Sequence, residues 1–176
     1  MQVVRTVALF VLAVVLSAAF GVAERILQDH SVTGWYLANV AGVWLAVAFV
    51  FGAVAPVRKQ AWLLGLVAEM SALGAFYGYM RFGEHHHEPL YVIVFWTCCG
   101  LIAGPVFGLV GYAWRRLRSQ VAGLVLGAMF VGEAVLLSVA GARPRTVTAL
   151  ESIAGVLVTA MLLAAVRWRT RQTHRR

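Results

Sequence analysis

The sequence predicts an all-α polytopic membrane protein, a bundle of six transmembrane helices with both termini in the cytoplasm. Of its 176 residues, 61% are hydrophobic and 12% are charged, whereas about 25% of the residues in a soluble domain are charged. The apolar residues come in blocks of roughly 20, the length that crosses a hydrocarbon core about 30 Å thick. Several blocks are apolar on every side, so they lack the polar face of a helix on a soluble protein.

Six apolar blocks define the expected spans, and short loops join them into one domain of antiparallel neighbours. The segment 21–23 (Gly-Val-Ala) resembles a signal-peptidase site. The apolar run before it is long for a signal peptide and only Arg5 precedes it, so we expect this block to be retained. The expected spans cover about residues 6–23, 35–55, 61–80, 90–114, 120–140 and 148–166 of a single domain 1–166, and a basic cytoplasmic tail covers 167–176.

The distribution of Lys and Arg predicts the orientation. Eleven lie at the amino terminus, in the 56–60 and 115–119 loops and in the tail, against four in the alternate loops (Arg25, Arg81, Arg143 and Arg145). The positive-inside rule then places both termini in the cytoplasm, and we expect the cell (plasma) membrane of a bacterium. Basic clusters at span ends anchor helices to anionic headgroups, so the net charge of +8 indicates the lipid bilayer as partner and no nucleic acid.

Glycines at four-residue spacing indicate where helices pack, because glycine lets backbones approach closely. The fourth block holds the longest series, and the third and fifth blocks repeat its spacing. These glycines are Gly100, Gly104, Gly108 and Gly111, then Gly74 and Gly78, then Gly123 and Gly127. Such faces also serve contacts between chains, so a homo-oligomer or a transporter partner subunit is an expected partner. A kink at Pro105 beside this face would open a cavity, which is the alternative to simple packing.

The fourth block contains a distinctive segment, Ala103-Gly104-Pro105-Val106-Phe107-Gly108-Leu109-Val110-Gly111, which runs into Trp114-Arg115-Arg116. Its G-P-V-F-G-x-x-G pattern resembles a family of uncharacterised six-span membrane proteins from actinobacteria. Chain length and span count fit the same family. The resemblance implies the architecture and brings no activity with it.

Carboxylates inside the apolar blocks are the strongest indication of function. Glu69 is expected about 12 Å into the third span and Glu133 about 20 Å along the fifth, while Glu24 and Glu151 flank the outer ends of the first and last spans. A charged carboxylate in mid-membrane costs at least about 2.5 kcal/mol. We therefore predict that Glu69 and Glu133 exchange protons, act as general acids or bind a cation. The alternative is that they only hydrogen-bond neighbouring helices together.

Polar and aromatic side chains on neighbouring spans complete the expected site, an outward-facing pocket with Glu69 at its floor. The predicted substrate-binding residues are Asn39, Trp44, Tyr77, Trp96, Glu24 and Glu151. Aromatic side chains at helical spacing also pack without any ligand, which is the alternative for these residues.

A polar run, Glu84-His85-His86-His87-Glu88, lies in the expected outer loop after the third span. Imidazole and carboxylate groups together ligate Zn²⁺, Ni²⁺ or Cu²⁺. His85, His86 and His87 are therefore candidate ligands of a divalent metal, with an ordinary hydrophilic turn as the alternative. No other cofactor is expected.

Three functions from different classes fit these features, and no motif of a soluble enzyme is present. The first is a small carrier or a membrane-embedded subunit that binds a solute or cation, favoured because outer acids and histidines above a midplane glutamate suit capture from outside. The second is an intramembrane enzyme acting on a lipid, such as a prenyl or terpenoid cyclase, with a buried glutamate as general acid and aromatic faces that stabilise a carbocation. The third is a structural or regulatory subunit without a ligand.

Overall fold

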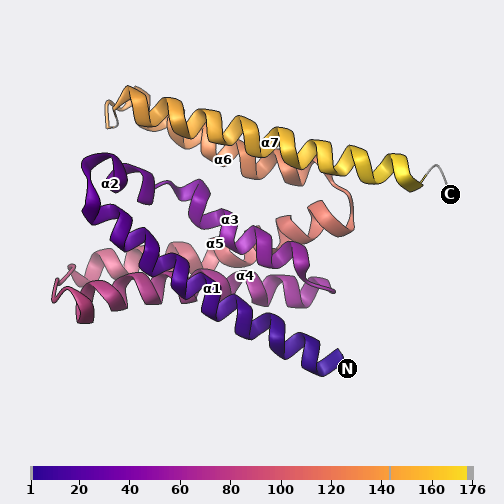
Figure 1. Cartoon of the computed structure of the whole chain (residues 1–176), viewed down its shortest axis with the longest axis horizontal. Helices are drawn as coiled ribbons and strands as arrows, with labels where there is room; N and C mark the ends of the chain where they lie inside the picture. Colours follow the sequence, from indigo (N-terminus) through magenta and orange to yellow (C-terminus); the bar gives the residue numbers. More distant parts are fainter. Residues whose placement is uncertain (1, 143, 174–176) are drawn as a thin grey trace.

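A computed structural model describes residues 2–142 and 144–173, and every regular element in these two ranges is a helix (Figure 1). The predicted all-α class is therefore confirmed. The elements are α1 (Gln2–His30), α2 (Val32–Ala38), α3 (Ala41–Val54), α4 (Arg58–Gly78), the π-helical turn η1 (Tyr79–Gly83), α5 (Leu90–Arg116), α6 (Gln120–Val139) and α7 (Arg145–Thr173).

The helices are long and apolar enough to make this a multi-pass membrane protein. Within the described ranges, five of them could each cross a membrane alone, namely α1, α4 with η1, α5, α6 and α7. The pair α2 and α3 passes the same test only when its two parts are taken together, with a bend of 42° between them, and it brings the total to six if it counts as one broken span. The 14 residues of α3 cover about 21 Å, so α3 needs α2 to complete a span of about 30 Å.

The structure differs from the expected spans in three places. The second span, expected as one helix over 35–55, is broken at Asn39 and Val40. The first span begins at Gln2 and runs to His30. The basic segment expected as a tail from residue 167 continues α7 as far as Thr173, because Arg, Gln and Trp residues sustain a helix beyond the hydrocarbon. Arg143 and residues 174–176 lie outside the described ranges.

Two groups of helices make up the bundle. α1, α3, α4 and α5 pack together, and α6 and α7 run side by side as a pair along their edge (Figure 1). The start of α1, the end of α7 and the turns after α3 and α5 lie at one end, which we call the basic end (Figure 1). The connections after α1, η1 and α6 lie at the other end, which we call the acidic end because Asp29, Glu84 and Glu88 belong to it.

Glycines of α5 let its backbone touch the backbones of α3 and α4. A Cβ at Gly108 would overlap the carbonyl oxygen of Ala61, and one at Gly111 would overlap that of Phe49. The predicted packing role of the Gly100–Gly111 series is thus confirmed, as it is for Gly123 and Gly127, which lie against α7. The predicted packing role within the bundle is wrong for Gly74 and Gly78. An added Cβ at either would meet no atom of a neighbouring helix within 4 Å, because both face away from the neighbouring helices.

Gly65→Ala and Gly74→Ala form a matched pair on α4, and only the first is expected to destabilise the fold. A Cβ at Gly65 would overlap the carbonyl oxygen of Gly104, whereas Gly74 faces open space. Overpacking of a close contact costs about 1–3 kcal/mol. Thermal unfolding of the two purified variants in detergent checks this, and equal melting temperatures would contradict the α4–α5 contact.

Candidate functional site

A cavity of about 240 Å³ lies among α3, α4, α5 and α6. Six of the residues predicted for the site line it, and these are Asn39, Trp44, Glu69, Tyr77, Trp96 and Glu133. Apolar or small side chains complete the lining at Ala41, Leu45, Leu73, Phe76, Cys99, Gly100 and Ala103. Four helices far apart in the sequence thus bring most of the predicted residues into one place.

Glu69 lies in the middle of α4, at the contact between α4 and α5. A Cβ at Gly100 would come within 3.2 Å of the Glu69 Cγ, and one at Gly104 within 3.0 Å of its Cβ. The two glycines therefore leave room for the glutamate side chain where α5 crosses it. Glu69 is only 4% exposed, and its buried Oε2 has no hydrogen-bond partner among the described residues. One wall of the cavity is thus a glutamate whose buried Oε2 meets no hydrogen-bond donor in the described part of the chain.

Edge-to-face aromatic pairs form one wall of the cavity. The Trp44 and Phe76 rings lie 5.6 Å apart at 75°, and the Phe76 and Tyr77 rings lie 5.2 Å apart at 87°. Phe20 of α1 supports Trp44 from behind at 5.4 Å. Trp96 stands on the exposed side of α5 with 47% of its surface accessible, so it lies at the rim of the cavity. Rings held in this way keep their positions whether or not a ligand is present.

The break between α2 and α3 forms another wall, and side chains satisfy its backbone groups. Asn39 donates from Nδ2 to the carbonyl of Trp35 (2.7 Å), and Trp44 donates from Nε1 to the carbonyl of Ala38 (2.9 Å). On the other side of the break, the amide of Ala41 donates to Glu133 Oε2 (2.7 Å). These bonds matter because an unsatisfied backbone group in hydrocarbon costs several kcal/mol.

Glu133 therefore has a structural partner that the sequence did not reveal. Val40 stands at the N-cap position of α3 without a side chain that could accept a hydrogen bond, and Glu133 of α6 supplies the acceptor from another helix. A carboxylate is also stabilised by the positive end of the helix dipole. The two glutamates predicted as equivalent thus differ, since Glu133 is engaged by α3 and Glu69 Oε2 is not.

Glu24 and Glu151 are buried, 8% and 2% exposed respectively, but neither lines the cavity. Glu24 lies on the face of α1 that also carries Gly21, whose backbone touches that of Ala72 in α4. Glu151 lies one turn after the buried Val147 of α7. The structure therefore places both residues outside the group that was predicted to bind a substrate.

The histidine run at the acidic end is divided among different contacts. His86 lies 3.5 Å from Glu88, and His87 contacts Arg81. Within residues 2–142 and 144–173, no group of three or more His, Cys, Asp or Glu side chains is placed to hold a metal ion. The described structure therefore does not bring His85, His86 and His87 together as ligands of one metal ion.

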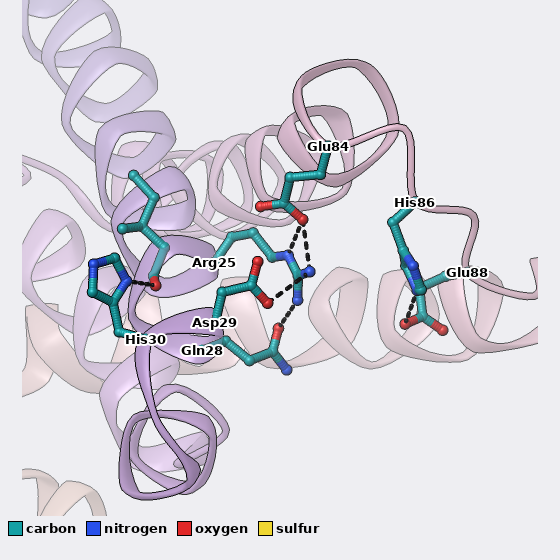
Figure 2. A network of polar contacts seen from close by, with 8 residues as sticks. Arg25, Gln28, Asp29, His30, Glu84, His86 and Glu88 are labelled. Atoms are coloured by element: carbon teal, nitrogen blue, oxygen red, sulfur yellow. Dashed lines mark hydrogen bonds and ion pairs between the residues drawn. The ribbon is translucent and has the colours of Figure 1, made fainter.

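Arg25 ties the end of α1 to the loop after η1 (Figure 2). Its guanidinium donates from Nε to Glu84 Oε2 (2.8 Å), pairs with Asp29 (3.0 Å) and donates to Gln28 (2.6 Å). A hollow of about 520 Å³ opens next to this loop, lined by Tyr77, Met80, Arg81, His86, His87, Glu88 and Ile93. Tyr77 borders both this hollow and the inner cavity.

Comparison with known proteins agrees with the uncharacterised family that the G-P-V-F-G-x-x-G segment indicated. No curated protein and no solved structure matches the chain. The family model of DUF6518, described as a family of unknown function, matches residues 1–175. The chain therefore belongs to the DUF6518 family.

Proposed function

We propose that the protein binds a small organic cation in the cavity at Glu69, as a carrier or as the membrane-embedded binding subunit of a transporter. One observation carries the proposal. Glu69 lines a cavity walled by aromatic rings, and its buried Oε2 has no hydrogen-bond partner among the described residues. A carboxylate in this position needs a cation or a proton.

The charge of the lining favours a cationic ligand. Four of the lining residues are ionisable, namely the carboxylic acids Glu69 and Glu133 together with Tyr77 and Cys99. The lining contains no Lys or Arg. The Trp44, Phe76, Tyr77 and Trp96 rings offer faces or edges around the same space, and aromatic faces attract ammonium groups. Together these groups suit an amine or a quaternary ammonium ion with a small apolar body.

The size of the cavity favours this function over a lipid cyclase. A volume of about 240 Å³ equals that of roughly eight water molecules, and it lies below the about 300–1,000 Å³ of pockets that enclose drug-sized ligands. A prenyl chain is of that larger size. A small cation fits within the cavity, whereas an enclosed carbocation cascade on a polyprenyl lipid does not.

The broken second pass is consistent with a carrier. Discontinuous helices near the midplane are a recurrent feature of transporter binding sites, and here the break borders the cavity through Asn39 and Ala41. Tyr77, shared with the hollow at the acidic end, marks the route by which a ligand would enter. A partner subunit or a second copy of the chain would complete a transport cycle for so small a bundle.

We also propose that the protein lies in the plasma membrane with both termini in the cytoplasm. Eleven of the fifteen Lys and Arg residues lie in the amino-terminal segment, the 56–60 and 115–119 loops and the segment from residue 167 onward, which the positive-inside rule assigns to the cytoplasm. The acidic end would then face outward and attract cations. Reporters fused after Arg176 test this, since a cytoplasm-dependent reporter should be active and an export-dependent one silent. The reverse pattern would overturn the orientation.

Choline and its neutral isostere 3,3-dimethyl-1-butanol test the binding itself. The two probes share shape and differ in charge, so the purified protein in nanodiscs is expected to bind choline at least about tenfold more tightly, which corresponds to about 1.4 kcal/mol. Intrinsic tryptophan fluorescence reports binding through Trp44 and Trp96. Uptake into proteoliposomes then separates a carrier from a binding subunit. No preference for the cation would overturn the proposal and favour a structural subunit.

A further inference from the structure

A second hollow, distinct from the cavity and the acidic-end hollow, lies on the outside of the bundle at its basic end. Its volume is about 430 Å³, and it is lined by Arg58, Lys59, Trp62, Leu63 and Leu109. We propose that it is a binding site for an anionic phospholipid, with the phosphate at Arg58 and Lys59 and the upper part of an acyl chain against the apolar lining.

The two cations have no counterion among the residues that the structure describes. All seven Asp and Glu residues of the chain lie at the acidic end or within the spans, and neither Arg58 nor Lys59 has a carboxylate partner in the described ranges. Arg25 at the acidic end is, by contrast, paired with Glu84. The described part of the chain therefore supplies no negative charge to balance Arg58 and Lys59.

The lining of the hollow changes from basic to apolar with depth in the membrane, in the same order as a phospholipid changes from its phosphate to its acyl chains. Arg58 and Lys59 begin α4, Leu63 lies about 7 Å further along the helix, and Leu109 lies about 10 Å inward from the end of α5. Trp62 is 43% exposed and Leu63 is 42% exposed, so a ring suited to the headgroup region and an aliphatic side chain both remain accessible. Tryptophan is enriched at this depth of a bilayer.

Charge complementarity selects the occupant. A membrane surface that carries anionic lipid attracts each nearby Lys or Arg by about 1 kcal/mol. This corresponds to about a fivefold change in the occupancy of the site by the lipid. Leu63 and Leu109 give a soluble phosphate compound nothing to bind, whereas they contact the acyl chain of a lipid. The occupant is therefore a phosphatidylglycerol-like lipid of the leaflet at the basic end.

Brominated phosphatidylglycerol in phosphatidylcholine vesicles tests the site, because bromine quenches a nearby tryptophan. The signal is the part of the fluorescence that Trp62→Phe removes, measured on the full chain. We expect this part to be quenched severalfold more by brominated phosphatidylglycerol than by brominated phosphatidylcholine at equal mole fraction. Arg58→Gln with Lys59→Gln should abolish the difference, and Lys59→Gln alone should remove only part of it, because one cation remains.

Arg5→Gln is the matched control, since it removes one cation of the same end that does not line the hollow. It should leave the quenching unchanged. Equal quenching by the two lipids in the unmodified protein would overturn the proposal, as would an equal loss in Arg5→Gln. Inorganic phosphate added at millimolar concentration should not relieve the quenching, and full competition by phosphate would show that the site recognises the ion and not a lipid.

Discussion

Glu69→Gln is expected to weaken choline binding by about 10- to 100-fold while the protein remains folded. Glutamine has nearly the shape of glutamate and keeps the hydrogen-bonding capacity, but it removes the negative charge that faces the ammonium group. Interactions with a charged group contribute about 1.5–3 kcal/mol, which gives the stated range. Titration of choline into the variant in nanodiscs, with tryptophan fluorescence as the signal, measures the loss.

Glu24→Gln is the control for this experiment. Glu24 is also a buried glutamate whose Oε2 lacks a partner among the described residues, yet it does not line the cavity. Its replacement should leave choline affinity unchanged. An unchanged affinity in Glu69→Gln, or an equal loss in Glu24→Gln, would remove Glu69 from the binding site.

Glu133→Ala is expected to lower the free energy of unfolding by about 1–3 kcal/mol, the cost of leaving a buried donor unsatisfied. The side chain accepts the hydrogen bond of the Ala41 amide at the start of α3, and alanine cannot. Glu133→Gln keeps an acceptor oxygen and should lose less than half as much. Thermal unfolding in one detergent, followed by circular dichroism, compares the two variants.

Val135→Ala serves as the matched control on α6, because Val135 is 52% exposed and its truncation removes little packing. It should unfold close to the unmodified protein. The role of Glu133 at the helix start would be contradicted if Glu133→Ala unfolded like Val135→Ala, or if the glutamine variant were as unstable as the alanine variant.

The membrane spans were predictable because hydropathy is averaged over a long window of residues. The same averaging hides the break in the second span. Asn39 is a single polar residue between apolar segments, so the average hydropathy of the window stays high. The local sequence does show that Val40, at the start of α3, has no side chain that could cap the helix. The acceptor that makes it tolerable comes from residue 133, which no local pattern connects with residue 41.

The sequence predicts how deep in the membrane a cavity residue lies, but not the direction in which its side chain points. Glu69, Trp44 and Tyr77 were assigned to one pocket from their positions along the spans, and they line one cavity. Glu24 and Glu151, expected at the outer ends of their spans, do not line it, because position along a helix does not determine which way a side chain points around it. The same limit explains Gly74 and Gly78, whose spacing is that of a contact face but which face no neighbouring helix.

The glycine contacts divide the bundle into two closely packed groups of helices. α1, α3, α4 and α5 touch backbone to backbone, as at Gly21 with Ala72 and Gly52 with Gly108, and α6 touches α7 closely at Gly127 and Gly155. Between these groups no glycine brings two backbones together. The contacts run through side chains, in a cluster that includes Phe49, Phe107 and Phe130 and in the hydrogen bond from the Ala41 amide to Glu133. Backbones in contact cannot slide by a residue without a collision, whereas side chains can repack. The seam between the two groups is thus joined through side chains, where each group within itself is joined by close backbone contact. The cavity lies on this seam, with Glu69 in one group and Glu133 in the other.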